Sequence, residues 1–335
     1  MERVKFGIVG CGHIGKRHAA VIENDPDGEL IALCDNNEKA VKELSQMYSI
    51  NKWSTDFDQL LDEGCDVICV CTPHFLHKEM TIKALKSGIH VLVEKPMALS
   101  RKDAHDMIEA AQKEERKLYV VKQNRYNVPI LLAGKAIQEQ KLGKISMVQC
   151  NVFWNRNQDY YDQSNWRGIK NKEGGALFTQ ASHFIDLLVH WFGPVKDAKT
   201  KLGTHFHDID VEDVGLSTVS FESGILGSIS WTTNVYNKNY EGSITIIGEN
   251  GTIKIGGQYL NKIEFWDVKS YPLPDNISFV DKPNNYGKYQ GSSSNHHRVI
   301  EELIKNLNGN ESNIVEGQEG ELSIDAIEKI YSGSE

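Results

Sequence analysis

The sequence has little that would place it in a membrane or on a nucleic acid. No run of about 18 apolar residues occurs along the 335 residues, so no membrane span is expected. The formal net charge is -9 and no block of basic residues is present, which argues against nucleic acid and anionic lipid as partners. A cleft with a few local cations would still accept an acidic ligand. The hydrophobic content of 40% is that of a globular chain long enough for two domains.

Cysteine spacing typical of a metal site is also lacking. The six cysteines include no Cys-x-x-Cys pair, and most of them fall in apolar, strand-like runs. The N-terminus lacks the apolar stretch of a secretory signal, so we expect a cytoplasmic protein with buried, free thiols. His205, His207 and Asp208 alternate as metal ligands on a strand do, but they lack a fourth ligand. No metal is therefore expected.

A glycine-rich turn between a strand and a helix is the strongest local signal. The apolar run Val4–Val9 predicts a buried strand, and the residues from Lys16 to Asn24 predict a helix. A second apolar run, Leu30–Cys34, ends at Asp35. A glycine motif followed by an acid about 20 residues later is typical of dinucleotide binding. The residues of the turn expected to contact the dinucleotide are Gly10, Cys11, Gly12, His13, Ile14 and Gly15.

Each residue of this motif has a physical role. Gly10 allows the tight turn, Gly12 lets the pyrophosphate approach the backbone, and Gly15 lets the helix pack close to the strand. The helix N-terminus offers free N–H groups to the phosphates. Asp35 can accept hydrogen bonds from both ribose hydroxyls and would repel the extra phosphate of NADP. The predicted cofactor is therefore NAD.

Strands and helices continue to alternate up to residue 123. Further strands are predicted at Val67–Cys71, His90–Val93 and Leu118–Gln123, with helices between them. This pattern predicts a doubly wound parallel sheet, a Rossmann domain, over residues 1–123. Ligands of such sheets bind beyond the carboxyl ends of the strands. The residues at those ends are Gly10, Asp35, Thr72, Glu94, Lys95 and Gln123.

The remaining residues, 124–335, predict a second α/β domain rich in strands. Its strands begin with Ile145–Trp154 and are joined by turns such as Glu222-Ser223-Gly224. One helix is predicted to run from Gly175 to Phe192, which would put Thr179 and His183 on one face. His296 and His297 are expected to open a further helix, and could line a substrate pocket.

Two motifs and one long segment resemble a known family. The motifs are Thr72-Pro73-x-x-x-His77 and Glu94-Lys95-Pro96, and the segment runs from Gly174 to Leu188. With the glycine turn, they resemble the glucose–fructose oxidoreductase/inositol dehydrogenase (Gfo/Idh/MocA) family. The resemblance implies a Rossmann domain followed by an α/β domain with an open, mostly antiparallel sheet. It also implies a homo-oligomer, a dimer or tetramer, formed through the outer face of that sheet.

The family resemblance implies roles for individual residues. Lys95 and His183 would be catalytic. Trp166 and Arg167 would touch the nicotinamide end of the cofactor. The further residues implied in cofactor binding are Thr72, Pro73, His74, His77, Glu94, Lys95 and Gln123.

Segments of the second half resemble the sugar-nucleotide branch of the family. These are Asn151–Arg156, Tyr160–Gln163, Trp166–Gly168 and Thr179–His183. The branch oxidises the carbon-3 hydroxyl of UDP-linked N-acetylated sugar acids, of the UDP-N-acetylglucosaminuronate type, in the synthesis of bacterial surface polysaccharides such as O-antigen. Arg156, Arg167 and Lys170 are the cations available for its acidic groups, whereas Trp154 and Tyr161 could equally belong to the core. The implied substrate contacts are Lys95, Arg156, Tyr160, Tyr161, Thr179 and His183.

The chemistry needs a base for the hydroxyl proton and a group that stabilises the charged oxygen. An imidazole such as that of His183 titrates at about pH 6.5, and Lys95 can stabilise an alkoxide or act as base if buried. Which of the two is the primary base stays open. Many family members carry Asp where this chain has Thr179, which favours sugar nucleotides over free cyclitols. The alternatives are a dehydrogenase or reductase of a free sugar or cyclitol, a non-catalytic NAD sensor, and a structural or partner-binding protein.

Overall fold

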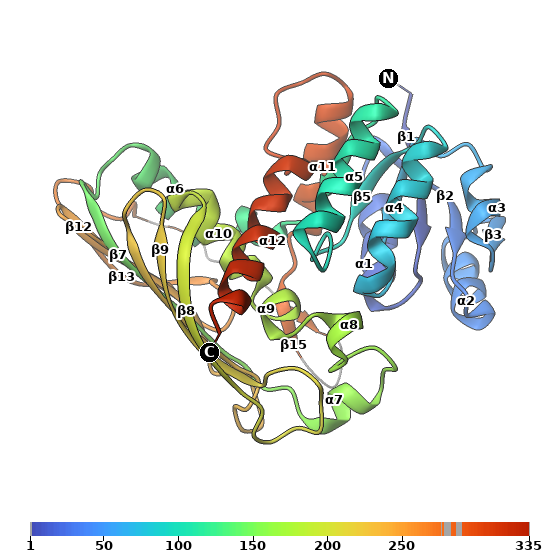
Figure 1. Cartoon of the computed structure of the whole chain (residues 1–335). Coiled ribbons are helices and arrows are strands. Elements are labelled where there is room, and N and C mark those ends of the chain that lie inside the picture. Colours follow the sequence, from blue (N-terminus) through green and yellow to red (C-terminus); the bar gives the residue numbers. More distant parts are fainter. Residues whose placement is uncertain (1, 276, 278–282, 286–289, 335) are drawn as a thin grey trace. The chain divides into compact units, whose positions relative to one another are not determined.

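The computed structural model describes residues 2–275, 277, 283–285 and 290–334 (Figure 1). The chain forms two compact units, which are described separately. The first comprises Met1–Lys122 and His296–Ile324, and the second comprises Gln123–Asn295 and Asp325–Glu335. The sequence had placed everything after residue 123 in the second domain. The structure instead groups the segment from His296 to Ile324 with the first unit, where its helix packs beside the helix of the glycine motif.

The first unit is built on a six-stranded parallel sheet. Its strand order is β3-β2-β1-β4-β5-β6, which confirms the predicted Rossmann fold. Neighbouring strands β1 and β4 lie on either side of the point where the order reverses, and ligands of such sheets bind there. The strands are β1 (Val4–Val9), β2 (Gly28–Cys34), β3 (Lys52–Ser54), β4 (Val67–Val70), β5 (His90–Val93) and β6 (Leu118–Val120).

Helices connect these strands, and local side chains cap several of them. The side chain of Asn37 accepts a hydrogen bond from the backbone of Ala40, and Ser100 does the same for Asp103. The helices of this unit are α1 (His13–Glu23), α2 (Glu38–Tyr48), α3 (Phe57–Leu61), η1 (His74–Leu76), α4 (His77–Lys86), α5 (Arg101–Lys113) and α11 (His296–Leu307), and α12 (Gly317–Ser332) begins here.

The second unit contains a seven-stranded sheet of the order β13-β12-β11-β7-β10-β9-β8. All its pairs are antiparallel except β7 with β10, which confirms the expected open, mostly antiparallel sheet. The strands are β7 (Ile145–Phe153), β8 (Val195–Gly203), β9 (Val214–Phe221), β10 (Leu226–Thr232), β11 (Glu241–Gly248), β12 (Gly251–Gly256) and β13 (Lys262–Val268), and a separate pair is formed by β14 (Pro283–Asn285) and β15 (Gln290–Ser293).

The long helix predicted from Gly175 to Phe192 is broken in the structure. A short helix ends at Thr179, and a second one begins at Ser182 and buries most of its residues. The prediction of one continuous face for Thr179 and His183 was therefore wrong. The helical elements of this unit are η2 (Gln123–Tyr126), α6 (Val128–Gln138), α7 (Gln158–Asp162), α8 (Lys170–Glu173), α9 (Ala176–Thr179) and α10 (Ser182–Phe192). Among the described residues, no helix is both long and apolar enough to cross a membrane.

Candidate active site

The glycine turn of the first unit has the shape that a dinucleotide needs. Gly10 has a φ of +95°, and a Cβ there would lie 2.6 Å from the carbonyl oxygen of Cys71. A Cβ on Gly15 would lie 1.9 Å from the carbonyl oxygen of Gly10, so no side chain fits at either position. A Cβ on Gly12 would meet no protein atom within 4 Å. The absent side chain of Gly12 therefore leaves room for a ligand.

The N-terminus of α1 is open to an anion. Gly12 is its N-cap and offers no side-chain hydrogen bond, and the first turn holds no acidic residue. Its first N–H groups therefore have no side-chain cap, and they carry the positive end of the helix dipole. His13 is exposed and Ile14 half-buried at this turn. Such an end is suited to the pyrophosphate of a dinucleotide.

Asp35 lies beside this turn at the end of β2. Its Oδ2 accepts a hydrogen bond from the backbone N–H of Cys11 at 2.6 Å, and its Oδ1 accepts one from Asn37 at 2.8 Å. Burial, followed by the charges of Asp35 and Cys34, raises the pKa of the Cys11 thiol to about 12. The thiol is therefore neutral, and Cys11 meets a ligand through its backbone.

The two histidines of the motif after β4 are buried in the protein. His77 is fully buried, with Nδ1 2.8 Å from the carbonyl oxygen of Pro96 and Nε2 2.8 Å from that of Thr72. Burial lowers the pKa of His77 in spite of these two acceptors, so the neutral ring donates to one of them at a time. The imidazole of His74 is also buried, 5.8 Å from that of His77. His77 therefore joins the loop after β4 to the loop after β5. Thr72 and Pro73 are half-buried, and Phe75 is exposed.

Glu94 is the centre of a buried cluster of three titratable groups. Its Oε1 lies 2.8 Å from Nε2 of His18 on α1 and 3.7 Å from Nε2 of His296 on α11. Its Oε2 accepts the backbone N–H of Lys95 at 3.1 Å. Burial raises the pKa of Glu94, but the hydrogen bond from His18 and the nearby imidazole of His296 outweigh it and hold the pKa well below its ordinary value. Glu94 thus fixes the backbone that carries half-buried Lys95.

This cluster is also the one group among the described residues whose side chains could hold a metal ion. Its possible ligand atoms lie within 4.8 Å of one another. However, Nδ1 of both His18 and His296 has no hydrogen-bond partner within the described part of the chain. Histidines that bind a metal usually donate their other N–H to a neighbouring acceptor. The arrangement therefore fits a hydrogen-bonded network better than a metal site.

In the second unit, His183 lies in the first turn of α10 and is 2% exposed. Its Nε2 is 3.0 Å from the amide nitrogen of Gln123 on η2. Arg125, two residues further along, makes two hydrogen bonds to the buried carboxylate of Asp186, at 2.7 and 2.8 Å. The segment that follows β6 is therefore joined to α10 at His183 and again at Asp186.

Aromatic rings and two arginines form a largely buried cluster in the second unit. The guanidinium of Arg156 lies 5.2 Å from the ring centre of Trp154 and 5.3 Å from that of Tyr160, and Arg167 stacks on Tyr160 at 4.2 Å. Arg156 is 4% exposed and donates to the side chain of Asn239. Tyr160 and Tyr161 are buried as well, whereas Trp166 and Arg167 are half-buried and Lys170 is exposed.

Two buried carboxylates accept backbone hydrogen bonds near the starts of the short helices α8 and α9. Glu173 accepts the backbone N–H of Gly168 at 2.6 Å and also bonds to the side chain of Thr179. Burial raises the pKa of Glu173 to about 7 in spite of these bonds. Glu212 accepts hydrogen bonds from Ala176 at 3.0 Å and from Tyr331 at 2.7 Å. Thr179 thus faces a carboxyl group of its own unit.

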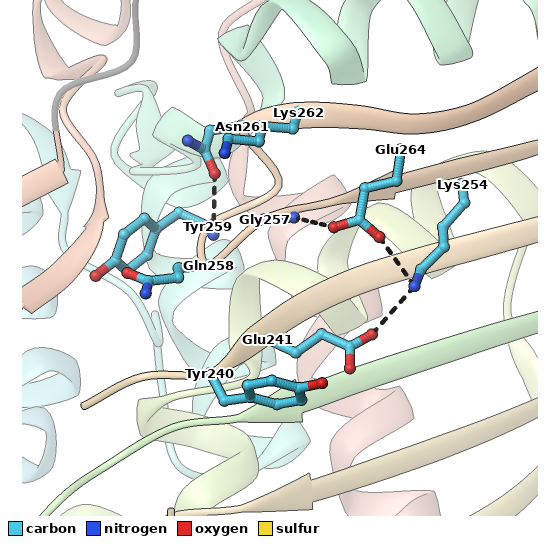
Figure 2. Close-up of a pocket in the computed structure, with 9 residues that line it drawn as sticks. All are labelled: Tyr240, Glu241, Lys254, Gly257, Gln258, Tyr259, Asn261, Lys262 and Glu264. Atoms are coloured by element: carbon cyan, nitrogen blue, oxygen red, sulfur yellow. Dashed lines mark hydrogen bonds and ion pairs between the residues drawn. The ribbon is translucent and has the colours of Figure 1, made fainter. Parts of the chain in front are cut away.

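A pocket of the second unit lies beside this cluster but is lined by other residues (Figure 2). Lys254 lies between the carboxylates of Glu241 and Glu264, at 3.5 and 2.9 Å. The backbone oxygen of Gln258, which lines the pocket, accepts the indole N–H of Trp154. None of the predicted site residues lines this pocket, so the predicted site and the pocket are separate.

Comparison with known families decides the assignment. Residues 4–122 match a model described as an oxidoreductase family with an NAD-binding Rossmann fold. Residues 130–254 match the GFO/IDH/MocA C-terminal domain. The chain belongs to the GFO/IDH/MocA oxidoreductase family. It is an NAD-dependent oxidoreductase acting on CH–OH groups, with NAD as its cofactor.

Two solved dehydrogenase structures share the fold over nearly the whole chain. The WlbA dehydrogenase from Chromobacterium violaceum, solved with NADH and UDP-GlcNAcA, is 36% identical, with a TM-score of 0.91 over 99% of this chain and 94% of that one. WlbA from Bordetella pertussis, solved with the same two ligands, is 34% identical, with a TM-score of 0.89 over 99% of this chain and 96% of that one. Myo-inositol 2-dehydrogenase of Thermotoga maritima is 24% identical over 96% of this chain and 93% of its own.

Sequence reasoning missed several side chains of this GFO/IDH/MocA protein. His18 and Glu173 were not singled out, because their partners Glu94 and Gly168 are known only once the chain is folded. His296 was considered for the substrate pocket, but its side chain is buried against Glu94 in the first unit. For His18, the sequence signal is its position three residues after Gly15, the last glycine of the motif.

Proposed function

We propose that this protein oxidises the carbon-3 hydroxyl of a UDP-linked N-acetylated sugar acid, of the UDP-N-acetylglucosaminuronate type, with NAD. The observation that carries the proposal is the 36% identity, over 99% of the chain, to a dehydrogenase solved with NADH and UDP-GlcNAcA. A role in bacterial surface-polysaccharide synthesis follows from the same substrate class. The other relatives act on several sugars and cyclitols, so the sugar itself rests on these two structures.

The proposed roles of the residues follow from the chemistry of alcohol oxidation. NAD, when bound, accepts the hydride from the carbon that bears the hydroxyl. The imidazole of His183 takes the hydroxyl proton, and the ammonium of Lys95 stabilises the charge that develops on the oxygen. Glu94 holds the backbone N–H of Lys95 at 3.1 Å, which supports a defined position for that side chain. The assignment of base and stabiliser to these two residues is part of the proposal.

The two arginines differ in how accessible they are to the acidic parts of the substrate. Arg167 is half-buried and stacks on Tyr160, so its guanidinium is oriented without being fully enclosed. Arg156 is 4% exposed and already bonded to Asn239. We therefore assign the direct contact with a substrate anion to Arg167, and to Arg156 the support of the wall formed by Trp154 and Tyr160.

The proposed oligomer would form through the exposed face of the seven-stranded sheet. Ile247 on β11, Met147 on β7 and Leu226 on β10 are cross-strand neighbours, and they are 39%, 41% and 61% exposed. A row of exposed apolar side chains on a broad sheet is suited to a second copy of the chain. Light scattering on the wild type and on a Leu226→Lys variant tests this. A monomeric wild type would contradict it.

A substrate panel tests the proposed specificity. The purified protein is incubated with NAD and, separately, with UDP-GlcNAcA, UDP-GlcNAc, glucose or myo-inositol, and NADH is followed by absorbance. We expect turnover with UDP-GlcNAcA, and a product lighter by two hydrogen atoms by mass spectrometry. Turnover of myo-inositol or glucose without any of a UDP-sugar would contradict the proposal. NAD binding without turnover of any of these substrates would support the alternative of an NAD sensor.

A further inference from the structure

An uncharged amide lies within hydrogen-bond distance of the proposed base. The amide nitrogen of Gln123 lies 3.0 Å from Nε2 of His183, and the two side chains belong to residues that are 4% and 2% exposed. Sequence reasoning had assigned Gln123 to the cofactor because it follows the last strand of the Rossmann sheet. The contact with His183 indicates a different role.

The position of Gln123 against the ring is fixed by the next ion pair along the chain. Nε and Nη2 of Arg125 bond to the two carboxylate oxygens of Asp186 at 2.7 and 2.8 Å. A planar guanidinium bonded at two points to a carboxylate defines both distance and orientation. Because Asp186 lies three residues after His183 on α10, this pair also fixes η2 beside the imidazole.

The hydrogen bond at one ring nitrogen determines where the proton sits on a neutral histidine. When the amide of Gln123 donates to Nε2 of His183, the ring proton is on Nδ1, and the Nε2 lone pair is engaged by the amide and cannot take a further proton. When the amide turns end over end and the ring proton moves to Nε2, the amide oxygen accepts from Nε2–H instead. The lone pair is then at Nδ1, which takes the hydroxyl proton, and the bond to the amide oxygen remains in the imidazolium. Within the described residues the turn breaks only the bond to the ring itself, because Oε1 of Gln123 has no partner there. A glutamine can thus serve both protonation states of the ring.

We propose that Gln123 is a positioning residue that orients His183 and sets the placement of its proton before and after proton transfer. This inference rests on the proposed function, in which His183 accepts the hydroxyl proton. The hydride leaves the same substrate for NAD, and Gln123 itself gains and loses no proton. An uncharged amide adds no negative charge beside the imidazole, whereas a carboxylate there would stabilise the imidazolium and raise its pKa.

The decisive variant is Gln123→Glu, which keeps the shape of the side chain and adds the charge. We expect the pKa of His183, followed by NMR in the ligand-free protein and assigned with His183→Asn, to rise by at least about one unit. The acid limb of the pH profile of kcat/KM should move to higher pH by the same amount. The Kd for NAD should stay within about twofold of the wild type. Gln46→Glu adds the same charge on the exposed face of α2 and serves as the matched control.

Gln123→Met removes the polar group at similar size. We expect kcat to fall by roughly tenfold, which corresponds to about 1.4 kcal/mol, with the KM for NAD unchanged. A raised Kd for NAD in both variants, with an unchanged titration of His183, would overturn the proposal and return Gln123 to the cofactor. The NMR titration and NAD binding need no sugar turnover. A failure of the proposed substrate is therefore distinguishable from a failure of this inference.

If the Gln123→Glu variant does not fold, an NMR measurement on the wild-type protein tests the proposed role of Gln123. The nitrogen chemical shifts of the imidazole report which ring nitrogen carries the proton. We expect neutral His183 to hold its proton on Nδ1, with Nε2 as the acceptor. An even mixture of both tautomers in the wild type would overturn the inference, because it would show that the amide does not select between them.

Discussion

The Oδ2 atom of Asp35 lies 2.6 Å from the backbone nitrogen of Cys11. The acid at the end of β2 therefore stabilises the glycine turn at the end of β1, in addition to its expected role with the ribose. Two neighbouring parallel strands thus end in groups that orient each other. A variant of Asp35 is expected to affect both the turn and the choice of cofactor.

Asp35→Ala should weaken NAD binding and lessen the discrimination against NADP. The loss of a hydrogen bond to a charged group is worth about 1.5–3 kcal/mol, so the Kd for NAD should rise by roughly ten- to a hundredfold. Calorimetric titration with NAD and with NADP measures both effects. Asp62→Ala, an exposed carboxylate elsewhere in the same unit, is the control. An unchanged ratio of the two affinities would show that the ribose is held by other groups.

Lys95→Ala and His183→Ala should each lower kcat by at least roughly a hundredfold, the usual scale of acid–base groups. The Kd for NAD should change little in His183→Ala, because the loss concerns the proton and not the dinucleotide. Steady-state kinetics with UDP-GlcNAcA measure the first effect and calorimetry the second. A near-normal rate in either variant would remove that residue from the mechanism.

Glu173 makes the stability of the second unit depend on pH. Its pKa is raised to about 7 by burial, so the folded protein holds this proton between the ordinary pKa of 4.5 and about 7 while the unfolded chain releases it. The contribution of Glu173 to the stability of the folded state is therefore fully present below pH 4.5. It is lost as the pH rises from 4.5 through about 7. Glu173→Gln, which cannot ionise, should gain stability relative to the wild type on going from pH 5 to pH 8, by an amount of roughly 3 kcal/mol. Parallel pH curves of thermal unfolding for the two proteins would contradict this.

The cluster around Glu94 should be sensitive to the loss of its carboxylate. Glu94→Ala removes the partner of His18 and of His296 and the acceptor for Lys95 N–H, and breaking such a buried pair costs about 3–5 kcal/mol. Glu94→Gln keeps an acceptor and should lose less. Denaturant unfolding of both variants measures the difference. Equal stabilities of Glu94→Ala and the wild type would show that the cluster does not stabilise the fold.

The first unit was predictable because its signals are local. The strand Val4–Val9, the glycine turn and Asp35 follow one another within a short stretch, and each is read from neighbouring residues. Parallel strands covered on both faces also give continuous apolar runs that periodicity detects. The packing of α11 against α1 was not predictable in this way, because it joins segments at opposite ends of the chain.

The break between α9 and α10 shows why the site was only partly predictable. Gln180 and Ala181 are compatible with a helix, so nothing local marks the end at Thr179. The break is accompanied by contacts from distant residues, because Glu212 accepts the N–H of Ala176 and Gln180 donates to Tyr160. Tertiary hydrogen bonds of this kind override helix propensity and are invisible in one sequence. The sequence likewise predicts Gln123 as a site residue from its position at the end of a strand. Its contact with His183 is seen only in the folded structure.

The most direct test of the proposed reaction is the origin of the transferred hydride. UDP-GlcNAcA carrying deuterium at carbon 3 is incubated with the protein and NAD, and the reduced cofactor is examined by mass spectrometry. The account predicts that the deuterium appears in the cofactor and that the sugar becomes a ketone at carbon 3. Turnover that leaves the deuterium on the sugar, with the hydride taken from another carbon, would contradict it.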